Sequence, residues 1–319
     1  MIVTRTPLRV SFFGGGSDIP EYWEHGDGLC VSAAINKYIY IAANRCATDH
    51  VRVVYSEMEV VKNVNDLKHD RVREVLKMLF MRSNIEICSF SDVPTKGTGL
   101  GSSSTFTVGL LNALGYYDKH ELAQAAAHIE IDCCNEPIGY QDQYAAAFGN
   151  LNAYKFYDRD DIKVSKIHTS SKFTLEDNLL CFNTGINRQA SSVLKSQVEN
   201  LQMGGVNVET TKSMVDIAKY SIKLLENNRV DDFGALLNET WALKKKLSTG
   251  ISNSTIDEMY DCVMKAGALG GKLLGAGGGG YLLAYVPNKY KVSVLEAMKD
   301  YERFDFKFDL EGSKVEMNA

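Results

Sequence analysis

The sequence predicts an α+β protein of two domains, in which strands and helices mix without a regular βα repeat. In the first half, short β-branched and apolar runs come before segments with helical spacing of apolar residues. In the second half, long helical segments surround a few short strands, and glycine runs interrupt the chain at three places. The chain has 319 residues, 45% hydrophobic and 24% charged, which is enough for one or two sizeable cores.

Strands are expected first, because the early segments are rich in apolar and β-branched residues. The expected strands of the first half are residues 2–5, 8–13, 29–34, 38–44, 51–55 and 85–90. Asn36 and Lys37 are expected to form a turn between two of them. The expected helices are 71–81, 105–114, 118–134 and 142–148. Glu121 follows Asp118 by three residues, as in a capping box that opens the third of these helices.

A charged stretch at residues 157–166 is interpreted as an exposed loop or hairpin, and the domain boundary is placed there. This gives an N-terminal domain at residues 1–165 and a C-terminal domain at residues 166–319. The expected strands of the second domain are 179–182, 272–274, 281–286 and 304–310. Its expected helices are 188–201, 211–227, 231–246, 255–268 and 291–299.

Charge and composition exclude several classes of protein. The net charge of −5 gives no general attraction to nucleic acid or anionic membranes, so an anionic substrate would need a local cluster of basic groups. Seven cysteines without framework spacing indicate reduced thiols, and the six histidines show no metal-ligand spacing. No signal-peptide core and no apolar run of membrane-spanning length is found, so a cytoplasmic protein is expected.

A phosphate-binding loop is predicted where a strand leads into a helix. Its residues are Gly97, Thr98, Gly99, Leu100, Gly101, Ser102, Ser103 and Ser104. Three glycines let the backbone approach an anion closely and adopt positive φ. The serines stand at the helix start, where free N–H groups and the positive end of the dipole favour phosphate. A flexible loop capped by serine is the plainer alternative, but glycine at every second position argues against it.

Two common phosphate loops are excluded by the same residues. A P-loop requires Gly-Lys-Ser/Thr after its second glycine, and here Ser102 follows Gly101. The dinucleotide fingerprint requires G-x-G-x-x-G, whereas this run is G-x-G-x-G. Two further glycine runs, at residues 14–16 and 277–280, are each compatible with a simple turn or with a backbone pressed against a ligand.

In order and spacing, these three segments resemble the motifs of the GHMP kinases, a family that includes galactokinase and mevalonate kinase. Pro94 and the run from Gly99 to Ser104 fit the most specific of the motifs. The resemblance spans nearly the whole chain. It implies an N-terminal domain with a ribosomal-protein-S5-like fold, a ferredoxin-like C-terminal domain, and binding of ATP, Mg²⁺ and the acceptor between them.

Other segments resemble the heptose-kinase branch of that family. They are Arg5-x-Pro-x-Arg-x-Ser with Gly-Gly-Gly-Ser-Asp, residues 139–144, residues 184–188 and Trp241-x-x-Lys-Lys-x-Leu-Ser. Such enzymes phosphorylate the anomeric hydroxyl of D-glycero-D-manno-heptose 7-phosphate to the 1,7-bisphosphate on the way to GDP-heptose. Fucokinase domains share much of the pattern, so a kinase of another sugar stays open, as does a related decarboxylase. A non-catalytic sugar and ATP sensor is the other alternative.

The resemblance also assigns catalytic roles. Asp142 would accept the proton of the acceptor hydroxyl, although an aspartate in the first turn of a helix is common without such a role. Arg9 would keep Asp142 ionised or neutralise charge on the moving phosphoryl group. Ser103 and Glu130 would bind Mg²⁺ through hard oxygens, although Glu130 could be a solvated helix residue. The presence of all four residues argues against the sensor.

Substrate contacts follow from the same comparison. Asp18 would accept hydrogen bonds from sugar hydroxyls, unless it only caps a short helix. Arg188 and Lys96 are candidates for binding a distal phosphate, and each could equally be a surface charge. The glycines expected to contact the substrate are Gly15, Gly16, Gly277 and Gly278. The expected partner is a small sugar or sugar phosphate, with no nucleic acid and no membrane, and a homodimer is considered.

Overall fold

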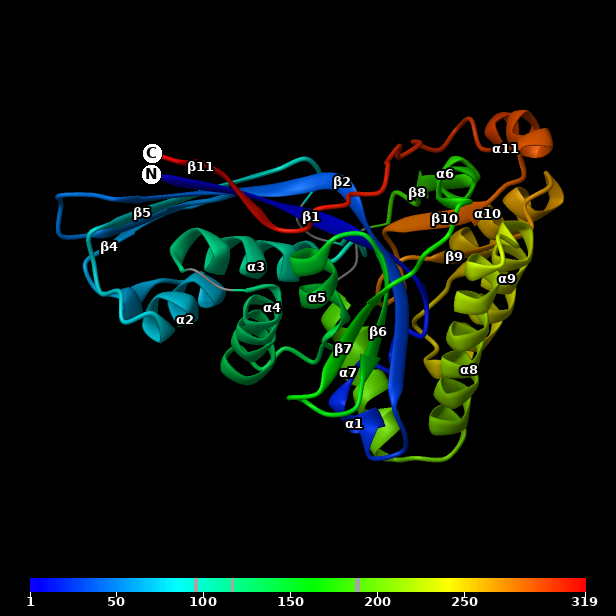
Figure 1. Ribbon diagram of the computed structural model, residues 1–319, viewed down its shortest axis with the longest axis horizontal. Helices are drawn as coiled ribbons and strands as arrows, with labels where there is room; N and C mark the ends of the chain where they lie inside the picture. Colours follow the sequence, from blue (N-terminus) through cyan, green and yellow to red (C-terminus); the bar gives the residue numbers. More distant parts are fainter. Residues whose placement is uncertain (95–96, 116–117, 187–189) are drawn as a thin grey trace.

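The computed structural model describes residues 1–94, 97–115, 118–186 and 190–319. Its strands form an eight-stranded sheet, here the large sheet, and a three-stranded sheet, here the small sheet (Figure 1). Helices are grouped beside both sheets and do not alternate with the strands in a regular repeat. The predicted α+β fold is therefore confirmed.

Two long antiparallel strands form the centre of the large sheet, β1 (Ile2–Phe13) and β2 (Gly28–Arg45). The turn expected at Asn36 and Lys37 is wrong, because β2 continues through both residues. The register instead shifts between Pro7 and Leu8, where Pro7 pairs with Tyr38 and Leu8 with Ile35. Proline has no backbone N–H to donate, so a bulge opposite it costs the ladder little.

The remaining strands of the large sheet are β3 (Val51–Val54), β4 (Met58–Val61), β5 (Ile85–Ser91), β6 (Leu151–Phe156), β7 (Ile162–Lys166) and β11 (Lys314–Asn318). Strands β4, β6 and β11 were not predicted. The charged stretch at 157–166 contains the turn and second strand of the β6–β7 hairpin. The strand expected at residues 304–310 is wrong, since only isolated bridges at Arg303 and Phe308 form there.

The small sheet has the order β8 (Leu179–Asn183), β10 (Tyr281–Tyr285) and β9 (Gly270–Leu273). Strand β11 then returns to the large sheet and pairs with β1, so the two chain ends lie side by side (Figure 1). The chain passes from the large sheet to the small sheet between β7 and β8, but its last strand, β11, belongs to the large sheet again. The domain division at residue 166 stays a prediction.

Most predicted helices are present. The described helices are α1 (Pro20–Trp23), α2 (Asp70–Met78), α3 (Ser102–Leu114), α4 (Lys119–Ala127), α5 (Gln141–Phe148), α6 (Lys172–Asp177), α7 (Ala190–Gln202), α8 (Val206–Glu226), α9 (Val230–Leu247), α10 (Ser254–Lys265) and α11 (Lys291–Ala297). Short 3₁₀ turns occur at Val64–Asp66 and Asn288–Tyr290. The helix expected at 118–134 changes to π geometry at His128–Cys133. Its predicted N-cap is confirmed, because Asp118 Oδ1 accepts from the Glu121 N–H at 2.9 Å.

Packing brings the glycine-rich segments together. Helices α3 and α5 pack on β1 and β2, and α9 packs on β9 (Figure 1). Helix α3 is buried on most sides, because alternating small and apolar residues such as Gly109 let it lie close to β1. The N-terminal ends of α3 and α5 therefore meet near the middle of β1. Among the described residues, no helix is both long and apolar enough to cross a membrane.

Candidate active site

An arginine and an aspartate form the centre of the site. Arg9 lies in β1, and Asp142 lies in the first turn of α5. Arg9 donates from Nε to Asp142 Oδ1 at 2.7 Å and from Nη2 to Oδ2 at 2.6 Å. A two-point bond of this kind fixes both the position and the plane of the carboxylate. The Arg9 side chain is 6% exposed and that of Asp142 is 24% exposed, so the carboxylate stays accessible.

The glycine loop at residues 97–104 lies directly against this pair. Gly97, Gly99 and Gly101 have φ of 76°, 71° and 79°, values that favour glycine. Arg9 Nη1 donates to the Gly99 carbonyl at 2.6 Å. A Cβ on Gly101 would lie 3.2 Å from Asp142 Oδ2. The start of α3, with its free N–H groups, is therefore adjacent to the carboxylate.

The third glycine segment closes over the loop. A Cβ on Gly99 would lie 2.5 Å from the Leu274 carbonyl, and one on Gly275 would lie 2.5 Å from Gly99 Cα. The two backbones thus touch with no room for side chains. The predicted substrate glycines lie in two places: Gly16 donates its N–H to Asp18, whereas Gly278 donates to the Ile251 carbonyl at 2.9 Å.

Asp18 is a second carboxylate beside the first. It follows β1 and is 7% exposed. Its Oδ1 accepts from the Gly16 N–H at 2.8 Å and its Oδ2 from the Gln141 N–H at 3.2 Å. Burial, and then the charge of Asp142, raise the pKa of Asp18 above its ordinary value. Because Gln141 precedes Asp142, one short segment holds both carboxylates in a fixed relation.

Gly139 leaves the space that Asp18 occupies. A Cβ there would lie 2.1 Å from Asp18 Oδ2 and 2.4 Å from its Cγ. We expect Gly139→Ala to displace the Asp18 carboxylate and to raise KM for the sugar by at least about tenfold, which corresponds to about 1.4 kcal/mol of binding. Steady-state kinetics should show a much smaller change in KM for ATP. Asp18→Asn serves as the matched variant, and an unchanged sugar KM in both would contradict the role of Asp18.

Two lysines that were not predicted as site residues complete the centre. Lys244, near the end of α9, is 7% exposed and donates from Nζ to the Gly275 carbonyl. Burial, followed by repulsion from Arg9, lowers its pKa to about 8. Lys272, in β9, is 2% exposed and donates to the Phe12 carbonyl at 2.9 Å. Burial and then Lys244 lower the pKa of Lys272 well below its ordinary value.

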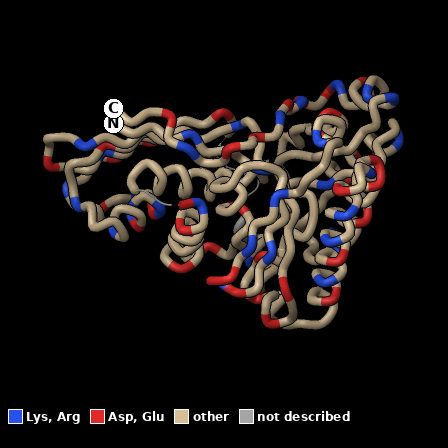
Figure 2. The backbone as a smooth tube through the Cα atoms, in the orientation of Figure 1, with Lys and Arg blue, Asp and Glu red and all other residues tan. Residues whose placement is uncertain are grey.

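The three cations and two carboxylates form one electrostatic cluster. Lys244 interacts with Arg9, Asp18 and Asp142, and Lys272 interacts with Lys244 and Arg9. An anion placed among them would favour the charged form of each lysine and so raise its pKa. By contrast, Figure 2 shows both signs of charge interspersed along the outer helices α8 and α9. The attraction for an anion is therefore local, as the net charge requires.

Glu130 lies deeper, in the π-helical turn after α4. Its side chain is fully buried; Oε1 accepts from Arg71 Nε at 3.0 Å and Oε2 from Gln143 Nε2 at 2.7 Å. Helix α3, which carries the exposed Ser103 hydroxyl, packs against this turn. Within the described residues Gln143 Oε1 has no hydrogen-bond partner. A hydroxyl, a carboxylate with free lone pairs and an unpartnered carbonyl are hard oxygens that suit Mg²⁺.

The buried ion pair of Glu130 with Arg71 also predicts a stability effect. We expect Glu130→Gln to lower the free energy of unfolding by about 3 kcal/mol, because it removes one partner of a buried pair. Arg71 keeps Glu136 at 2.9 Å, which limits the loss. Urea unfolding would measure it. Glu136→Gln is the matched control: its carboxylate is 28% exposed, so less than about 1 kcal/mol is expected. Equal effects would contradict this account.

Two predicted residues and one cavity stand apart from this centre. Arg188 and Lys96 lie outside the described residues. A cavity of about 660 Å³ lies between α8 and the β6–β7 hairpin, and it includes none of Arg9, Asp18 and Asp142. Four lysines line it: Lys155, Lys166, Lys212 and Lys219. Three of them are paired with acidic residues, at 2.9–3.2 Å.

The fold and the site together define a phosphotransferase that acts on a hydroxyl group. A glycine loop at a helix start is suited to binding phosphate, and an accessible carboxylate held by arginine lies next to it. Residues 60–150 match the GHMP kinases N terminal domain, and residues 221–302 match GHMP kinases C terminal. These matches together cover just over half of the chain. The chain belongs to the GHMP kinases, as predicted, and is an ATP-dependent kinase.

Its relatives include sugar kinases of full length. It is 28% identical to D-glycero-alpha-D-manno-heptose 7-phosphate kinase of Campylobacter jejuni, over 98% of each chain. It is 24% identical to L-fucokinase/L-fucose-1-P guanylyltransferase of Bacteroides fragilis, over 87% of this chain and 34% of that protein. The crystal structure of a D-glycero-D-manno-heptose 1-phosphate kinase from Bacteroides thetaiotaomicron shares the fold, with a TM-score of 0.81, 23% identity and 100% coverage of both chains.

Proposed function

We propose that this kinase transfers the γ-phosphate of Mg·ATP to the anomeric hydroxyl of D-glycero-D-manno-heptose 7-phosphate, forming the 1,7-bisphosphate on the way to GDP-heptose. The observation that carries the proposal is the Arg9–Asp142 ion pair, held between the glycine loop and Asp18. The Campylobacter jejuni relative, similar over nearly the whole chain, supports the choice of acceptor.

The residues divide the work of phosphoryl transfer. Free N–H groups at the start of α3 bind the nucleotide phosphates, while Asp18 accepts hydrogen bonds from sugar hydroxyls. Asp142 accepts the hydroxyl proton on a carboxylate oxygen, since each oxygen keeps a lone pair beyond its bond to Arg9. Arg9 and Lys244 face the developing negative charge on the transferred group.

A magnesium ion would be held by Ser103 and Glu130, where the oxygen donors suit it. Bound to the nucleotide, Mg²⁺ would neutralise phosphate charge and orient the transferred group. Arg71 donates to one oxygen of Glu130 and Gln143 donates to the other, so the two together hold the carboxylate in position. Gln143 couples the two parts of the site, because it follows Asp142 and donates to Glu130.

The distal phosphate of the acceptor would need basic groups of its own. We retain Arg188 and Lys96 for this role as a prediction. A fucose kinase remains the second candidate, because the Bacteroides fragilis fucokinase matches 87% of this chain. A homodimer and a cytoplasmic location also remain predictions.

ADP release from Mg·ATP, measured against a panel of sugars, tests the proposal. The panel contains D-glycero-D-manno-heptose 7-phosphate, the same heptose without phosphate, mannose, fucose and galactose. Strong turnover with the heptose 7-phosphate alone would support both the acceptor and the basic pocket. Turnover with fucose or another neutral sugar would keep the kinase and discard that pocket. ATP binding without turnover on any of them would favour the sensor.

A further inference from the structure

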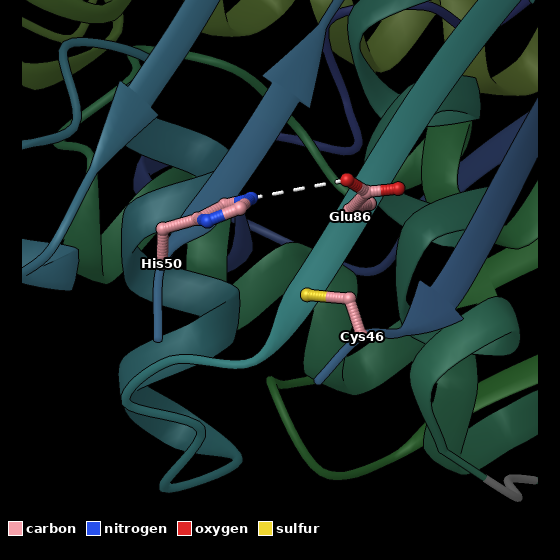
Figure 3. Close-up of side chains that lie close together, drawn as sticks. All are labelled: Cys46, His50 and Glu86. Carbon is pink, nitrogen blue, oxygen red and sulfur yellow. Dashed lines mark ion pairs between the residues drawn. The ribbon is translucent and has the colours of Figure 1, made fainter. Parts of the chain in front are cut away.

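A cysteine, a histidine and a glutamate converge at the end of the large sheet that lies away from the active site. Cys46 follows β2, His50 precedes β3, and Glu86 lies in β5. Their ligand atoms, one from each side chain, all lie within 4.8 Å of one another (Figure 3). All three side chains are partly exposed. The spacing of histidines in the sequence did not suggest this, because the third ligand comes from a strand 36 residues later.

We propose that Cys46, His50 and Glu86 bind one divalent transition-metal ion, of which Zn²⁺ is the type. The donors are a thiolate, an imidazole and a carboxylate, the three ligand kinds of protein zinc sites. In a tetrahedral zinc site, bonds of about 2.0–2.3 Å place ligand atoms about 3.3–3.8 Å apart. His50 Nε2 and Glu86 Oε1 are already 3.8 Å apart. A small rotation of the Cys46 side chain would complete the set.

The ligand atoms of Cys46, His50 and Glu86 make only long hydrogen bonds and ion pairs with other described residues. The Glu86 carboxylate accepts no hydrogen bond from any described residue, and its nearest side-chain nitrogens are Arg52 Nε at 3.6 Å and His50 Nε2 at 3.8 Å. The Thr48 hydroxyl lies 3.3 Å from Cys46 Sγ and 3.4 Å from His50 Nε2. This oxygen, or a water, would fill the fourth position. The Thr48 side chain therefore places a possible fourth ligand oxygen beside the other ligand atoms.

The backbone that carries the ligands is fixed, so binding requires little ordering. The Cys46 N–H donates to the Asn84 carbonyl at 3.0 Å, and the Ile85 N–H donates to the His50 carbonyl at 3.3 Å. Asn84 Nδ2 also donates to the Thr48 carbonyl at 3.1 Å. The loop at residues 46–50 is thus tied to the start of β5 at three points, and an ion would tighten that connection.

This site is distinct from the kinase centre. Arg9 pairs with Ala34 in β2, and Cys46 lies twelve residues further along the same strand direction. Two of these residues belong to the register shift opposite Pro7, so at about 3.3 Å per residue the two lie up to about 33 Å apart. A metal here would stabilise the end of the large sheet without touching substrate. The oxygen donors near Glu130 suit Mg²⁺, whereas this thiolate and imidazole suit a softer ion.

Titration of the whole metal-free protein with Co²⁺, followed by displacement with Zn²⁺, tests the proposal. We expect one Co²⁺ per chain, with a thiolate-to-cobalt absorption band that Zn²⁺ removes. Cys46→Ser should abolish the band, and Glu86→Gln should weaken binding at least about tenfold. Arg52→Gln should strengthen it, because the competing cation is gone. Cys133→Ser is the matched control: its exposed thiol lies 3.6 Å from His128 Nε2, and the band should persist in that variant.

Unfolding provides a second readout that does not depend on the kinase reaction. Zn²⁺ should raise the urea midpoint of the natural protein and of Cys133→Ser, and leave that of Cys46→Ser unchanged. A band that survives Cys46→Ser, or the absence of any thiolate band in the natural protein, would overturn the proposal.

Discussion

Replacing Asp142 with asparagine should lower turnover by about 10²–10⁴ while the protein still binds ATP. The amide keeps the size of the carboxylate and can still accept one bond from Arg9, but it cannot take the proton of the acceptor hydroxyl. Because the Asp142 carboxylate bonds only to Arg9 among the described residues, the change should leave the glycine loop in place. Steady-state kinetics and equilibrium nucleotide binding would measure the two effects separately.

Asp92→Asn provides a control for the same chemical change at a distance from the site, since the Asp92 carboxylate accepts the Tyr38 N–H on the surface. Its turnover should match that of the natural protein. Near-normal turnover of Asp142→Asn would remove Asp142 from its role as base and shift attention to Asp18.

Replacing Lys244 with methionine should lower kcat/KM by at least about tenfold and at the same time stabilise the protein. At neutral pH the buried ammonium is protonated although its pKa is about 8, compared with 10.5 for an ordinary lysine. That difference corresponds to about 3 kcal/mol of destabilisation at pH 7. Methionine removes it and loses the bond to the Gly275 carbonyl, worth about 2 kcal/mol because the donor is charged, so a gain of about 1 kcal/mol is expected.

The pH dependence should follow from the same lysine. Below pH 8 Lys244 is charged in both the folded and unfolded chain, and its burial cost is fully present. Between about pH 8 and 10.5 the unfolded chain binds the proton more strongly, so this cost falls as pH rises. Activity should fall where stability rises. We expect kcat/KM to decrease as pH rises through about 8, and we expect Lys244→Met to show no such decrease.

Lys245→Met is the matched control, because Lys245 is the next residue of α9 and its side chain is 39% exposed. It should change neither the unfolding free energy nor the pH profile appreciably. A Lys244→Met protein that is less stable than the natural one, with an unchanged pH profile, would assign the lysine a purely structural role.

The sequence was most informative where a motif is local. The glycine loop, its position at the start of a helix and the capping of α4 by Asp118 each depend on residues within a few positions of one another. Arg9 and Asp142 were found through the resemblance to the family, and the structure brings them into direct contact. Their separation by 133 residues could not have been bridged from spacing alone.

The misses depend on contacts that are distant in sequence. Residues 304–310 alternate like a strand, but the segment crosses between the two sheets and pairs only at isolated bridges. Strand β11 is short, charged and mostly exposed, so its pattern gave no strand signal, and its partner β1 is at the other end of the chain. The sequence around Lys272 could have indicated a buried cation, because a single lysine stands there between apolar residues and a glycine run.

The pairing of β11 with β1 has a consequence for how the chain is made. The Met1 amino group and the Ala319 carbonyl bond to each other, and the Ala319 N–H donates to the Met1 carbonyl at 2.9 Å. One edge of β1 therefore stays open during synthesis until β11 has been made, and an open edge can pair with other chains. A short linker that joins the two ends would close this edge from the start, and new ends could be placed in the exposed turn after β6.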